Sequence, residues 1–371
     1  MKIIIVGAGK IGVTIAKILH QADEYDVTLA SRDEVRLSTF KEKTPVKTLV
    51  LDITHEETLI SSLIGFDTVI SALPFYHNIT IAKAALEVGL NYFDLTEDIQ
   101  TVKAIHDIAV DAKEGQIFMP QCGLAPGFIG ILGHGLSRGF EKLRSIKMRV
   151  GALPLYPTNQ LKYNLSWSTD GLINEYCNPC EMILDGKYQK SIPLEGLEHF
   201  TLDGTEYEAF NTSGGLGTLC ETFKDKVENL NYKTVRYKGH HFLMNFLLNG
   251  LYFRDNKNEL KDILESSIPV SHQDVVLIFC SVSGWINGKL EQLSYAKKLY
   301  HNEYYGEHFS AIEITTATGL CTALDIFREG KLPKKGYIKQ EDIALDDFFN
   351  NRFGKIYESA QPIESILDVT S

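Results

Sequence analysis

The chain has 371 residues, 44% of them apolar and 23% charged, which is the composition of an ordinary globular protein. A single core stops growing at roughly 250 to 300 residues, so this length predicts two domains. The formal net charge of −11 disfavours nucleic acid and membrane surfaces as partners. No segment approaches the ~20 apolar residues of a membrane span, the N-terminus lacks a signal-peptide pattern, and the six dispersed cysteines fit reduced thiols. These features predict a cytoplasmic protein.

Short β-branched runs alternate with segments of helical period over the first 120 residues. The predicted strands lie near residues 2–6, 26–30, 47–51, 67–72, 91–95 and 116–120. The predicted helices lie near residues 11–22, 55–64, 77–89 and 98–114, with Thr54 as a cap for the second and Gly89 at the end of the third. This alternation predicts a doubly wound parallel sheet of the Rossmann type, and therefore an α/β fold.

A glycine-rich turn follows the first strand, where Gly7, Gly9 and Gly12 form Gly-x-Gly-x-x-Gly around Lys10 and Ile11. The first glycine permits a tight turn, the second lets backbone approach a pyrophosphate, and the third lets the helix pack on the strand. Because the motif follows a strand and opens a helix, it predicts a dinucleotide site with the phosphates at the helix N-terminus.

The end of the second strand carries the residues expected to choose between NADP and NAD. NAD enzymes usually place an acid there for the ribose hydroxyls, whereas this chain has Ser31 and Arg32, which suit a 2′-phosphate. We therefore predict NADP as the cofactor. The alternative is NAD, with Arg32 in solvent and Asp33 at the ribose.

The third and fourth strands should also end beside the cofactor, because ligands of such sheets bind outside the carboxyl ends of the strands. After the third strand, Asp52 and Ile53 could flank the adenine. After the fourth, Ala72, Leu73 and Pro74 are expected to reach toward the nicotinamide.

Polar groups follow the fourth, fifth and sixth strands at the same edge of the sheet. The candidate substrate and catalytic groups there are Tyr76, His77, Asp94, Cys122 and Gly123. Capping of a helix or strand is the alternative role for His77 and Asp94. Packing is the alternative for Cys122, because buried thiols are common.

The alternation stops at residues 122–127, where two glycines and a proline mark a domain boundary. Beyond it the pattern predicts an α+β second domain, with strands at 145–150, 234–237 and 275–282 and an apolar segment at 242–251. Residues 311–328 predict one amphipathic helix that could pack back on the first domain. Cys177 and Cys180 have metal-like spacing but no second pair or well-placed histidines, so we interpret them as a turn and predict no metal.

Two stretches of the second domain carry candidate substrate groups. Thr212, Ser213 and Gly214 open a glycine-rich loop, and Arg236 and His240 lie at the end of a strand. An arginine suits a substrate that bears a carboxylate. The alternative is an ordinary surface cation paired with one of the many acids.

These stretches together resemble the saccharopine dehydrogenase family, which includes saccharopine reductases and lysine 6-dehydrogenases. The resemblance extends over nearly the whole chain and is carried by the glycine loop and residues 71–74, 123–127, 208–210, 212–216 and 232–240. The last stretch looks like lysine 6-dehydrogenases, which tend to read Tyr-Pro-Gly-His there, but Lys238 replaces the proline and so changes what fixes the turn. Ser31-Arg32 looks more like the NADP-using saccharopine reductases.

The resemblance implies a Rossmann domain over residues 1–123, completed by about 310–371, and an inserted domain over 124–309 that lines the cleft and mediates homodimerisation. It implies hydride transfer between the nicotinamide and a carbon bearing an amine, in saccharopine, lysine or a similar amino-acid substrate. Arg236 would bind the substrate carboxylate, and His77, Asp94 or His240 would move the proton. The alternatives are a carboxynorspermidine-type polyamine dehydrogenase and a non-catalytic protein that senses dinucleotides.

Overall fold

The computed structural model describes residues 1–304, 306–363 and 366–368, and the chain divides into two compact units. The first unit contains Met1–Phe128 and Glu313–Lys355, and the second contains Ile129–Ile312 and Ile356–Ser371. These boundaries differ from the expected ones. The first falls after Phe128 rather than after residue 123, and the chain beyond Lys355 groups with the second unit rather than with the first.

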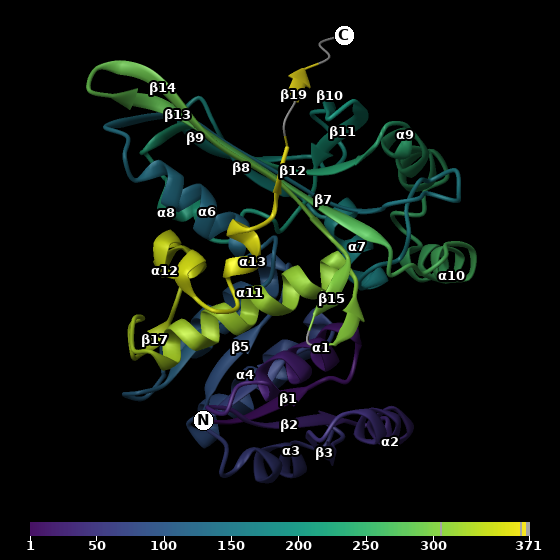
Figure 1. The fold of residues 1–371 in the computed structure, drawn as a ribbon, viewed down its shortest axis with the longest axis vertical. Coiled ribbons are helices and arrows are strands. Elements are labelled where there is room, and N and C mark those ends of the chain that lie inside the picture. Colours follow the sequence, from purple (N-terminus) through teal and green to yellow (C-terminus); the bar gives the residue numbers. More distant parts are fainter. Residues whose placement is uncertain (305, 364–365, 369–371) are drawn as a thin grey trace. The chain divides into compact units, whose positions relative to one another are not determined.

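The first unit is built on a seven-stranded parallel sheet in the order β17-β6-β5-β4-β1-β2-β3 (Figure 1). Because β1 lies between β2 and β4, the chain winds outward from the middle of the sheet in both directions, which confirms the α/β doubly wound prediction. The strands are β1 (Lys2–Val6), β2 (Asp26–Ser31), β3 (Lys47–Val50), β4 (Thr68–Ser71), β5 (Asn91–Asp94), β6 (Ile117–Met119) and β17 (Gly336–Tyr337).

Helices connect these strands. Those in the first 128 residues are α1 (Lys10–His20), α2 (Glu34–Lys43), α3 (Glu56–Leu63), the 3₁₀ turn η1 (Phe75–His77), α4 (Asn78–Val88) and α5 (Ile99–Ala109). Later in the chain follow α11 (Ala311–Arg328), the 3₁₀ turn η3 (Gln340–Asp342), α12 (Leu345–Asn350) and α13 (Lys355–Glu358).

All four helices expected in the first region form, as α1, α3, α4 and α5, and α2 is an additional one. Gly89 ends α4 in the left-handed conformation with φ 88°, as expected. The expected cap at Thr54 is wrong, because His55 is the residue before α3 and caps it without a side-chain hydrogen bond. The Thr54 hydroxyl instead donates to Asp52 Oδ1 at 2.8 Å.

The core of the first unit packs the apolar faces of the central strands against the helices. Ile4, Val69, Tyr92 and Phe118 are fully buried in it, and α4 adds Ile81 together with several alanines. Burial of each large apolar side chain contributes roughly 1.5–3 kcal/mol to stability. The carboxyl ends of β1, β2 and β4 are therefore held on a rigid frame.

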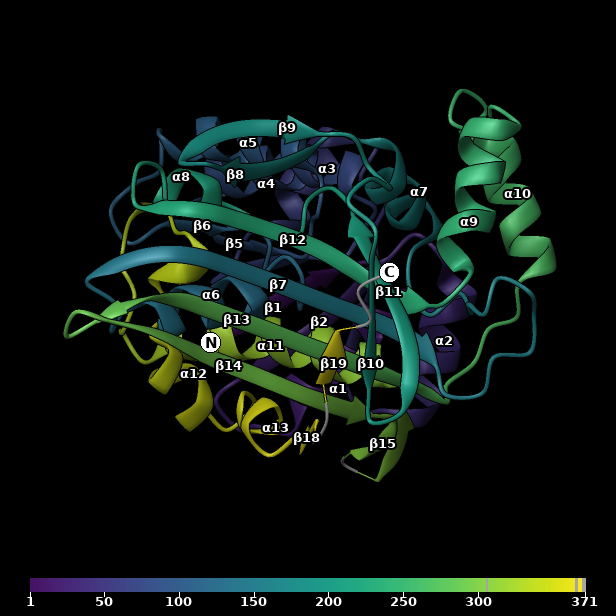
Figure 2. The same cartoon turned by 90° about the horizontal axis from the view of Figure 1, so that it is seen from above.

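The second unit contains a mixed sheet in which β18-β14-β13-β7-β12-β11-β10-β19 follow one another, and β8 and β9 extend it beside β12 (Figure 2). The pair β7·β12 is parallel, whereas β13 pairs antiparallel with β7 and with β14. The strands are β7 (Lys142–Pro154), β8 (Cys180–Leu184), β9 (Lys187–Ser191), β10 (Glu198–Leu202), β11 (Thr205–Asn211), β12 (Val227–Tyr237), β13 (Asp274–Ile286), β14 (Lys289–Tyr300), β18 (Gln361–Pro362) and β19 (Ile366–Asp368).

The three strands expected in this region are parts of the longer β7, β12 and β13, and the apolar segment at 242–251 is helical. The helices are α6 (Phe128–Ser137), α7 (Thr169–Cys177), α8 (Leu219–Thr222), α9 (His240–Asn245), the π-helical turn η2 (Phe246–Gly250) and α10 (Lys257–Ser267). A separate hairpin joins β15 (Asn302–Tyr304) to β16 (Glu307–Phe309). The unit is therefore α+β in composition, with a mixed sheet.

Candidate cofactor and substrate sites

The glycine-rich turn between β1 and α1 has the geometry that a pyrophosphate requires. Gly7 has a φ of 120°, and a Cβ there would lie 2.5 Å from the Ala72 carbonyl oxygen. A Cβ on Gly12 would collide with the Gly7 carbonyl oxygen, whereas a Cβ on Gly9 would meet nothing within 4 Å. Only at Gly9 does the turn open outward, at the start of α1, where the first amides have no intrahelical acceptor.

At the end of β2, Arg32 is exposed to solvent, whereas Asp33 forms contacts within its own turn. Asp33 caps α2 by accepting the Arg36 backbone N–H at 3.0 Å and forms an ion pair with the same residue's Nε at 3.1 Å. The Asp33 backbone N–H donates to the Ser31 hydroxyl oxygen at 3.1 Å, which leaves that hydroxyl proton available. Arg32 is exposed and forms no hydrogen bond or ion pair with any described residue. This division of roles favours the 2′-phosphate interpretation over ribose binding by Asp33.

The residues after β3 are held by their own turn. Asp52 Oδ1 accepts the Thr54 backbone N–H at 2.9 Å in addition to the Thr54 hydroxyl, and these bonds lower the pKa of the carboxyl. Ile53 is half-buried and packs against the core of the first unit. An apolar side chain beside an exposed carboxylate is compatible with the expected adenine-flanking position.

The residues after β4 pack closely against the glycine-rich turn. The Ala72 backbone N–H donates to the Val6 carbonyl at 2.9 Å, and a Cβ on Gly7 would also lie 3.2 Å from Leu73 Cδ2. Pro74 follows and precedes η1. Ala72 and Leu73 therefore lie at the cofactor turn.

Tyr76 and His77 lie in η1 with their ring centroids 4.5 Å apart. The Tyr76 ring is 55% exposed and His77 is half-buried. Partial burial and the positive charge of Arg32 lower the pKa of His77. The imidazole is therefore neutral near pH 7 and lies within electrostatic range of the Arg32 guanidinium.

Asp94 at the end of β5 is fully buried and fully bonded. Its Oδ1 accepts the backbone N–H groups of Thr96 and Gln121, both at 2.9 Å. Its Oδ2 accepts the Tyr92 hydroxyl at 2.7 Å and the Asn78 amide at 3.1 Å. Burial raises the pKa of the carboxyl to about 6 despite these donors. The Asp94 carboxylate has no exposed atom, and its four protein donors connect the end of β5 to neighbouring segments. In this position it does not reach a substrate proton, so the expected catalytic role of Asp94 is corrected to a structural one.

Cys122 and Gly123 pack against the C-terminal part of the first unit. The Cys122 thiol accepts the Gln340 amide N–H at 3.1 Å and donates to the Met119 carbonyl at 3.1 Å, and burial raises its pKa. A Cβ on Gly319 of α11 would lie 2.7 Å from the Gly123 carbonyl oxygen. The geometry supports the packing alternative for Cys122, and the expected substrate contact is not supported.

In the second unit, the glycine-rich loop that starts at Thr212 is tied to α7. The Ser213 backbone N–H donates to the Glu175 carbonyl at 3.0 Å, and Gly214 has a φ of 85°. Thr212 is buried, and its hydroxyl has no hydrogen-bond partner among the described residues.

Arg236 on β12 is a buried cation without a bonded anion. It is 3% exposed, its Nε donates to the Tyr176 hydroxyl oxygen at 2.9 Å, and its Nη1 donates to the Val235 carbonyl at 2.8 Å. Its guanidinium carbon lies 5.1 Å from the Tyr163 ring centroid and 5.8 Å from that of Tyr176. Although burial opposes the charge, the neighbouring tyrosines and Glu175 raise the pKa of Arg236. Its burial argues against the surface-cation alternative. Glu175 acts on it through its charge, but no described carboxylate hydrogen-bonds to it.

His240, the first residue of α9, contacts this arginine only through Tyr176. Its Nε2 lies 3.1 Å from the Tyr176 hydroxyl, and its Nδ1 lies 2.8 Å from the Leu161 carbonyl. Burial and the Arg236 charge lower the pKa of His240 to about 3. A buried imidazole that stays neutral and has both nitrogens bonded is a poor proton carrier, so the expected catalytic role of His240 is also corrected.

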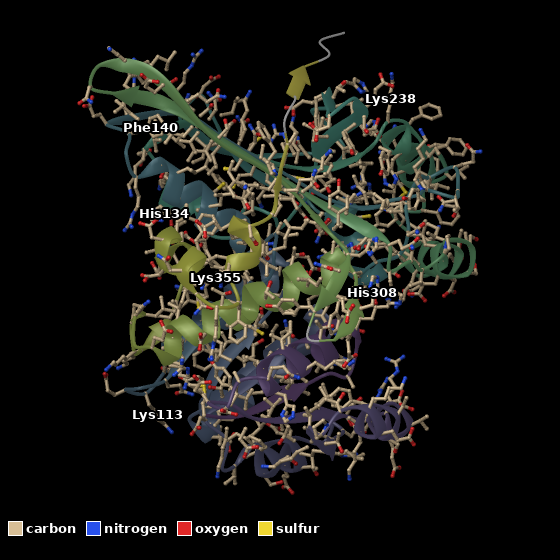
Figure 3. The ribbon with its side chains drawn as sticks, viewed as in Figure 1. Lys113, His134, Phe140, Lys238, His308 and Lys355 are labelled. Carbon is tan, nitrogen blue, oxygen red and sulfur yellow. The ribbon has the colours of Figure 1, made fainter. Side chains whose placement is uncertain are left out.

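The structure thus brings Arg236 and His240 together, as the sequence suggested, and adds two residues that sequence reasoning missed. Tyr176 joins them, and Tyr163 packs its ring on the guanidinium while accepting the Trp167 indole N–H at 3.1 Å. Tyr176 is the single aromatic residue of α7, and no local sequence pattern distinguishes it from a packing residue. Lys238, in place of the proline, lies in the turn before α9 (Figure 3), where Gly239 takes a φ of 102°.

No group of three or more histidine, cysteine, aspartate or glutamate side chains could hold a metal ion in the part of the chain that the structure describes. Among the same residues, no helix combines the length and apolar character that crossing a membrane requires.

A Rossmann-type unit with a glycine-rich first turn, together with a second unit built on a mixed sheet, is the architecture of a class of dinucleotide-binding proteins. Two family models match this chain: the saccharopine dehydrogenase NADP binding domain over residues 3–117, and the saccharopine dehydrogenase C-terminal domain over residues 123–356. The chain belongs to the saccharopine dehydrogenase family of NAD(P)-binding oxidoreductases.

Individual relatives are distant. Alpha-aminoadipic semialdehyde synthase of Rattus norvegicus is 23% identical over 286 residues, which are 70% of this chain and 29% of that protein. Saccharopine dehydrogenase [NADP(+), L-glutamate-forming] of Saccharomyces cerevisiae is 23% identical over 274 residues, 70% of this chain and 60% of that protein. The matched part thus spans less than two thirds of these relatives. The solved apo saccharopine dehydrogenase (L-Glu forming) of Saccharomyces cerevisiae has the same fold, with a TM-score of 0.78, 17% identity and 100% coverage of both chains.

Proposed function

We propose that this protein is an NADP-dependent oxidoreductase that makes or breaks a C–N bond of an amino-acid derivative bearing a carboxylate, such as saccharopine or lysine. The observation that carries this proposal is Arg236, a buried guanidinium that is influenced by the charge of Glu175 but hydrogen-bonds to no described carboxylate. A substrate carboxylate would supply acceptors for the guanidinium N–H groups that no described residue accepts. The relatives named as saccharopine dehydrogenase and alpha-aminoadipic semialdehyde synthase support the same substrate class.

The first unit offers a separate group of residues for each phosphate of NADP. The open Gly9 position and the first amides of α1 would hold the pyrophosphate, and Arg32 with the Ser31 hydroxyl would hold the 2′-phosphate. The bound dinucleotide supplies the hydride chemistry. The protein's own residues have to bind the substrate carboxylate, orient the amine-bearing carbon and hold one proton.

For the proton, His77 is the remaining candidate of the three that the sequence suggested. Asp94 and His240 are buried and bonded on all sides, whereas the His77 ring is half-exposed and neutral near pH 7. A neutral imidazole can accept a proton when the amine is oxidised and return it in the reverse direction.

The alternatives make different demands on Arg236. A dinucleotide sensor needs no buried cation in its second unit, so Arg236 argues against it. A polyamine without a carboxylate would bring ammonium groups toward a buried guanidinium, which is unfavourable. A carboxylated polyamine such as carboxynorspermidine satisfies the arginine and stays the second candidate function.

The test follows reduced-nicotinamide absorbance when the purified protein is mixed with saccharopine, lysine or carboxynorspermidine, each with NAD and with NADP. We expect turnover with saccharopine or lysine and a preference for NADP. Turnover with carboxynorspermidine alone would select the second candidate. Dinucleotide binding without turnover across a broad amine panel would overturn the enzyme proposal.

A further inference from the structure

A chain of hydrogen bonds runs through the interior of the second unit from strand β12 to helix α9 and on to the loop before α7. Arg236 Nε donates to the Tyr176 hydroxyl oxygen at 2.9 Å, and that hydroxyl lies 3.1 Å from His240 Nε2. His240 Nδ1 lies 2.8 Å from the Leu161 carbonyl. Arg236, Tyr176 and His240 are each no more than 3% exposed, so water does not compete for these bonds.

The donor and acceptor of each hydrogen bond in this series follow from the charged Arg236 guanidinium at one end. A guanidinium has only donors, so the Tyr176 oxygen must accept from Arg236. The single Tyr176 proton is then left for His240 Nε2, which must carry no proton of its own. The remaining imidazole proton therefore sits on Nδ1, where it donates to the Leu161 carbonyl, which can only accept.

The same contacts fix the plane of the guanidinium. Nε is held by Tyr176 and Nη1 by the Val235 carbonyl, while the Tyr163 ring packs on the guanidinium at 5.1 Å. Nη2 forms no hydrogen bond with any described residue. An arginine has several rotatable bonds, and fixing two of its three nitrogens leaves one orientation for the third.

We propose that His240 is a positioning residue, which acts through Tyr176 to fix the Arg236 guanidinium so that Nη2 faces the substrate carboxylate. This inference rests on the proposed function, because it assigns His240 a part in carboxylate binding. It differs from a proton-transfer role, because the imidazole keeps its one proton on Nδ1 throughout. Without the acceptor at Nε2, the Tyr176 proton has no fixed partner, and the lone pairs of the hydroxyl oxygen are no longer held toward Arg236 Nε. The bond that orients the guanidinium is therefore weakened.

Three substitutions distinguish a positioning role of His240 from a proton-transfer role and from a merely structural one. His240→Leu removes the acceptor, His240→Gln keeps an acceptor oxygen near the Nε2 position, and Tyr176→Phe removes one oxygen atom from the middle of the chain. Matched controls lie next to the same residues. His241→Leu removes a neighbouring imidazole that lies 2.7 Å from the Leu194 carbonyl, and Tyr237→Phe removes a hydroxyl that donates to the Pro154 carbonyl at 2.9 Å.

Trp167 provides a binding signal that does not need turnover, because its indole N–H donates to the Tyr163 hydroxyl and Tyr163 packs on Arg236. A Trp285→Phe background leaves Trp167 as the one tryptophan of the chain. Its fluorescence would be titrated with saccharopine, with lysine and with lysine amide, which lacks the carboxylate. Dinucleotide affinity, measured in parallel, verifies that the first unit is folded in each variant.

We expect His240→Leu and Tyr176→Phe to weaken saccharopine and lysine binding at least tenfold and to raise KM by the same factor, with kcat within threefold of the parent. His240→Gln should bind within threefold of the parent, and both controls within twofold. Affinity for lysine amide should hardly change in any of them. If His240→Leu does not fold, Tyr176→Phe carries the same test.

Four outcomes overturn the inference, and the last of them overturns the proposed function as well. A fall in kcat with unchanged KM in His240→Leu would assign proton transfer to His240. Equal losses for lysine and lysine amide would make its role merely structural. Parental binding by both His240→Leu and Tyr176→Phe would remove the positioning role while leaving the proposed function intact. If the parent itself bound neither saccharopine nor lysine, the proposed function would fail first and the positioning role with it.

Discussion

The two units each bury an ionised group beside a β-strand, and they treat it in opposite ways. Asp94 in the first unit accepts four hydrogen bonds from the protein, and no part of it is exposed. Arg236 in the second unit is nearly as buried, but it has two protein acceptors, two tyrosine rings and no bonded carboxylate. The difference indicates that the protein itself satisfies Asp94, whereas Arg236 keeps N–H groups that a substrate carboxylate would accept under the proposed function.

The largest effect that would test this difference between Asp94 and Arg236 is expected for Arg236→Met, which removes the charge and keeps a similar side-chain volume. Loss of one partner from a buried charged pair costs about 3–5 kcal/mol, so kcat/KM for a carboxylate substrate should fall by about two to four orders of magnitude. Stability should change little, because no described carboxylate hydrogen-bonds to the guanidinium and none is left without a bonded partner. Steady-state kinetics and denaturant unfolding measure the two effects.

A matched control for that variant is Arg149→Met on β7. Arg149 is also buried but donates two hydrogen bonds to Glu198, both at 2.9 Å. Its replacement should destabilise the protein with kcat/KM unchanged per folded molecule. If Arg236→Met destabilised the protein as much as Arg149→Met does, Arg236 would be a structural residue after all.

Asp94→Asn tests the other half of the comparison. The amide can donate where the carboxylate only accepts, so at least one of the four donors is left unsatisfied in the interior. We expect a loss of about 2–3 kcal/mol in the free energy of unfolding, with the activity of the folded fraction within severalfold of the parent. Denaturant unfolding and kinetics at matched folded concentration check this. A stable but inactive variant would restore Asp94 as a catalytic candidate.

Arg32→Ala sharpens the cofactor assignment. Loss of a charged hydrogen bond to a 2′-phosphate should weaken NADP binding by one to two orders of magnitude, about 1.5–3 kcal/mol, and leave NAD binding unchanged. Arg36→Ala, which removes an arginine already paired with Asp33, is the control and should affect neither cofactor. Equal losses for NAD and NADP would place Arg32 elsewhere on the cofactor.

The buried His240 and Asp94 should give opposite pH dependences of stability. The pKa of His240 is about 3 in the folded chain and about 6.5 when unfolded, so the unfolded state binds more protons and stability falls as pH drops below 6.5. The pKa of Asp94 is about 6 when folded and about 3.8 when unfolded, so its burial cost is relieved as pH drops from 6 toward 3.8.

His240→Gln should therefore gain about 1–2 kcal/mol relative to the parent between pH 7.5 and pH 5. Urea unfolding at both pH values, with His241→Gln as control, measures the difference. A parallel pH dependence of parent and variant would show that His240 titrates normally in the fold.

The sequence predicted the elements that a local pattern of residues determines. It missed the features that depend on packing between segments far apart in the chain. The strands and the turn at Gly7 follow from hydrophobic period and glycine spacing, which are local. Helix α2 was missed because it buries only Leu37 and Phe40 on a polar helix, so its apolar period is weak. Asp33, which caps this helix, was considered only as an alternative contact to the ribose.

The candidate site shows the same division. Arg236 was recognisable because an arginine at a strand end suits a carboxylate, but Tyr176 lies far from it in the chain and came into view only through the fold. Asp94 and His240 stand at positions typical of catalytic groups, and sequence cannot show that their hydrogen bonds are already satisfied. Burial and bonding belong to the tertiary structure, so these two roles could not be assigned before it.

The order of strands in the first sheet has a consequence for how the protein is made. Its edge strand β17 pairs with β6, although Ile129–Ile312 of the second unit lie between them in the chain. During synthesis the ribosome must therefore produce nearly all of the second unit before β6 gains that neighbour and α11 reaches Gly123. Until then a nascent chain carries an unpaired parallel edge, which is where chaperones would be expected to bind.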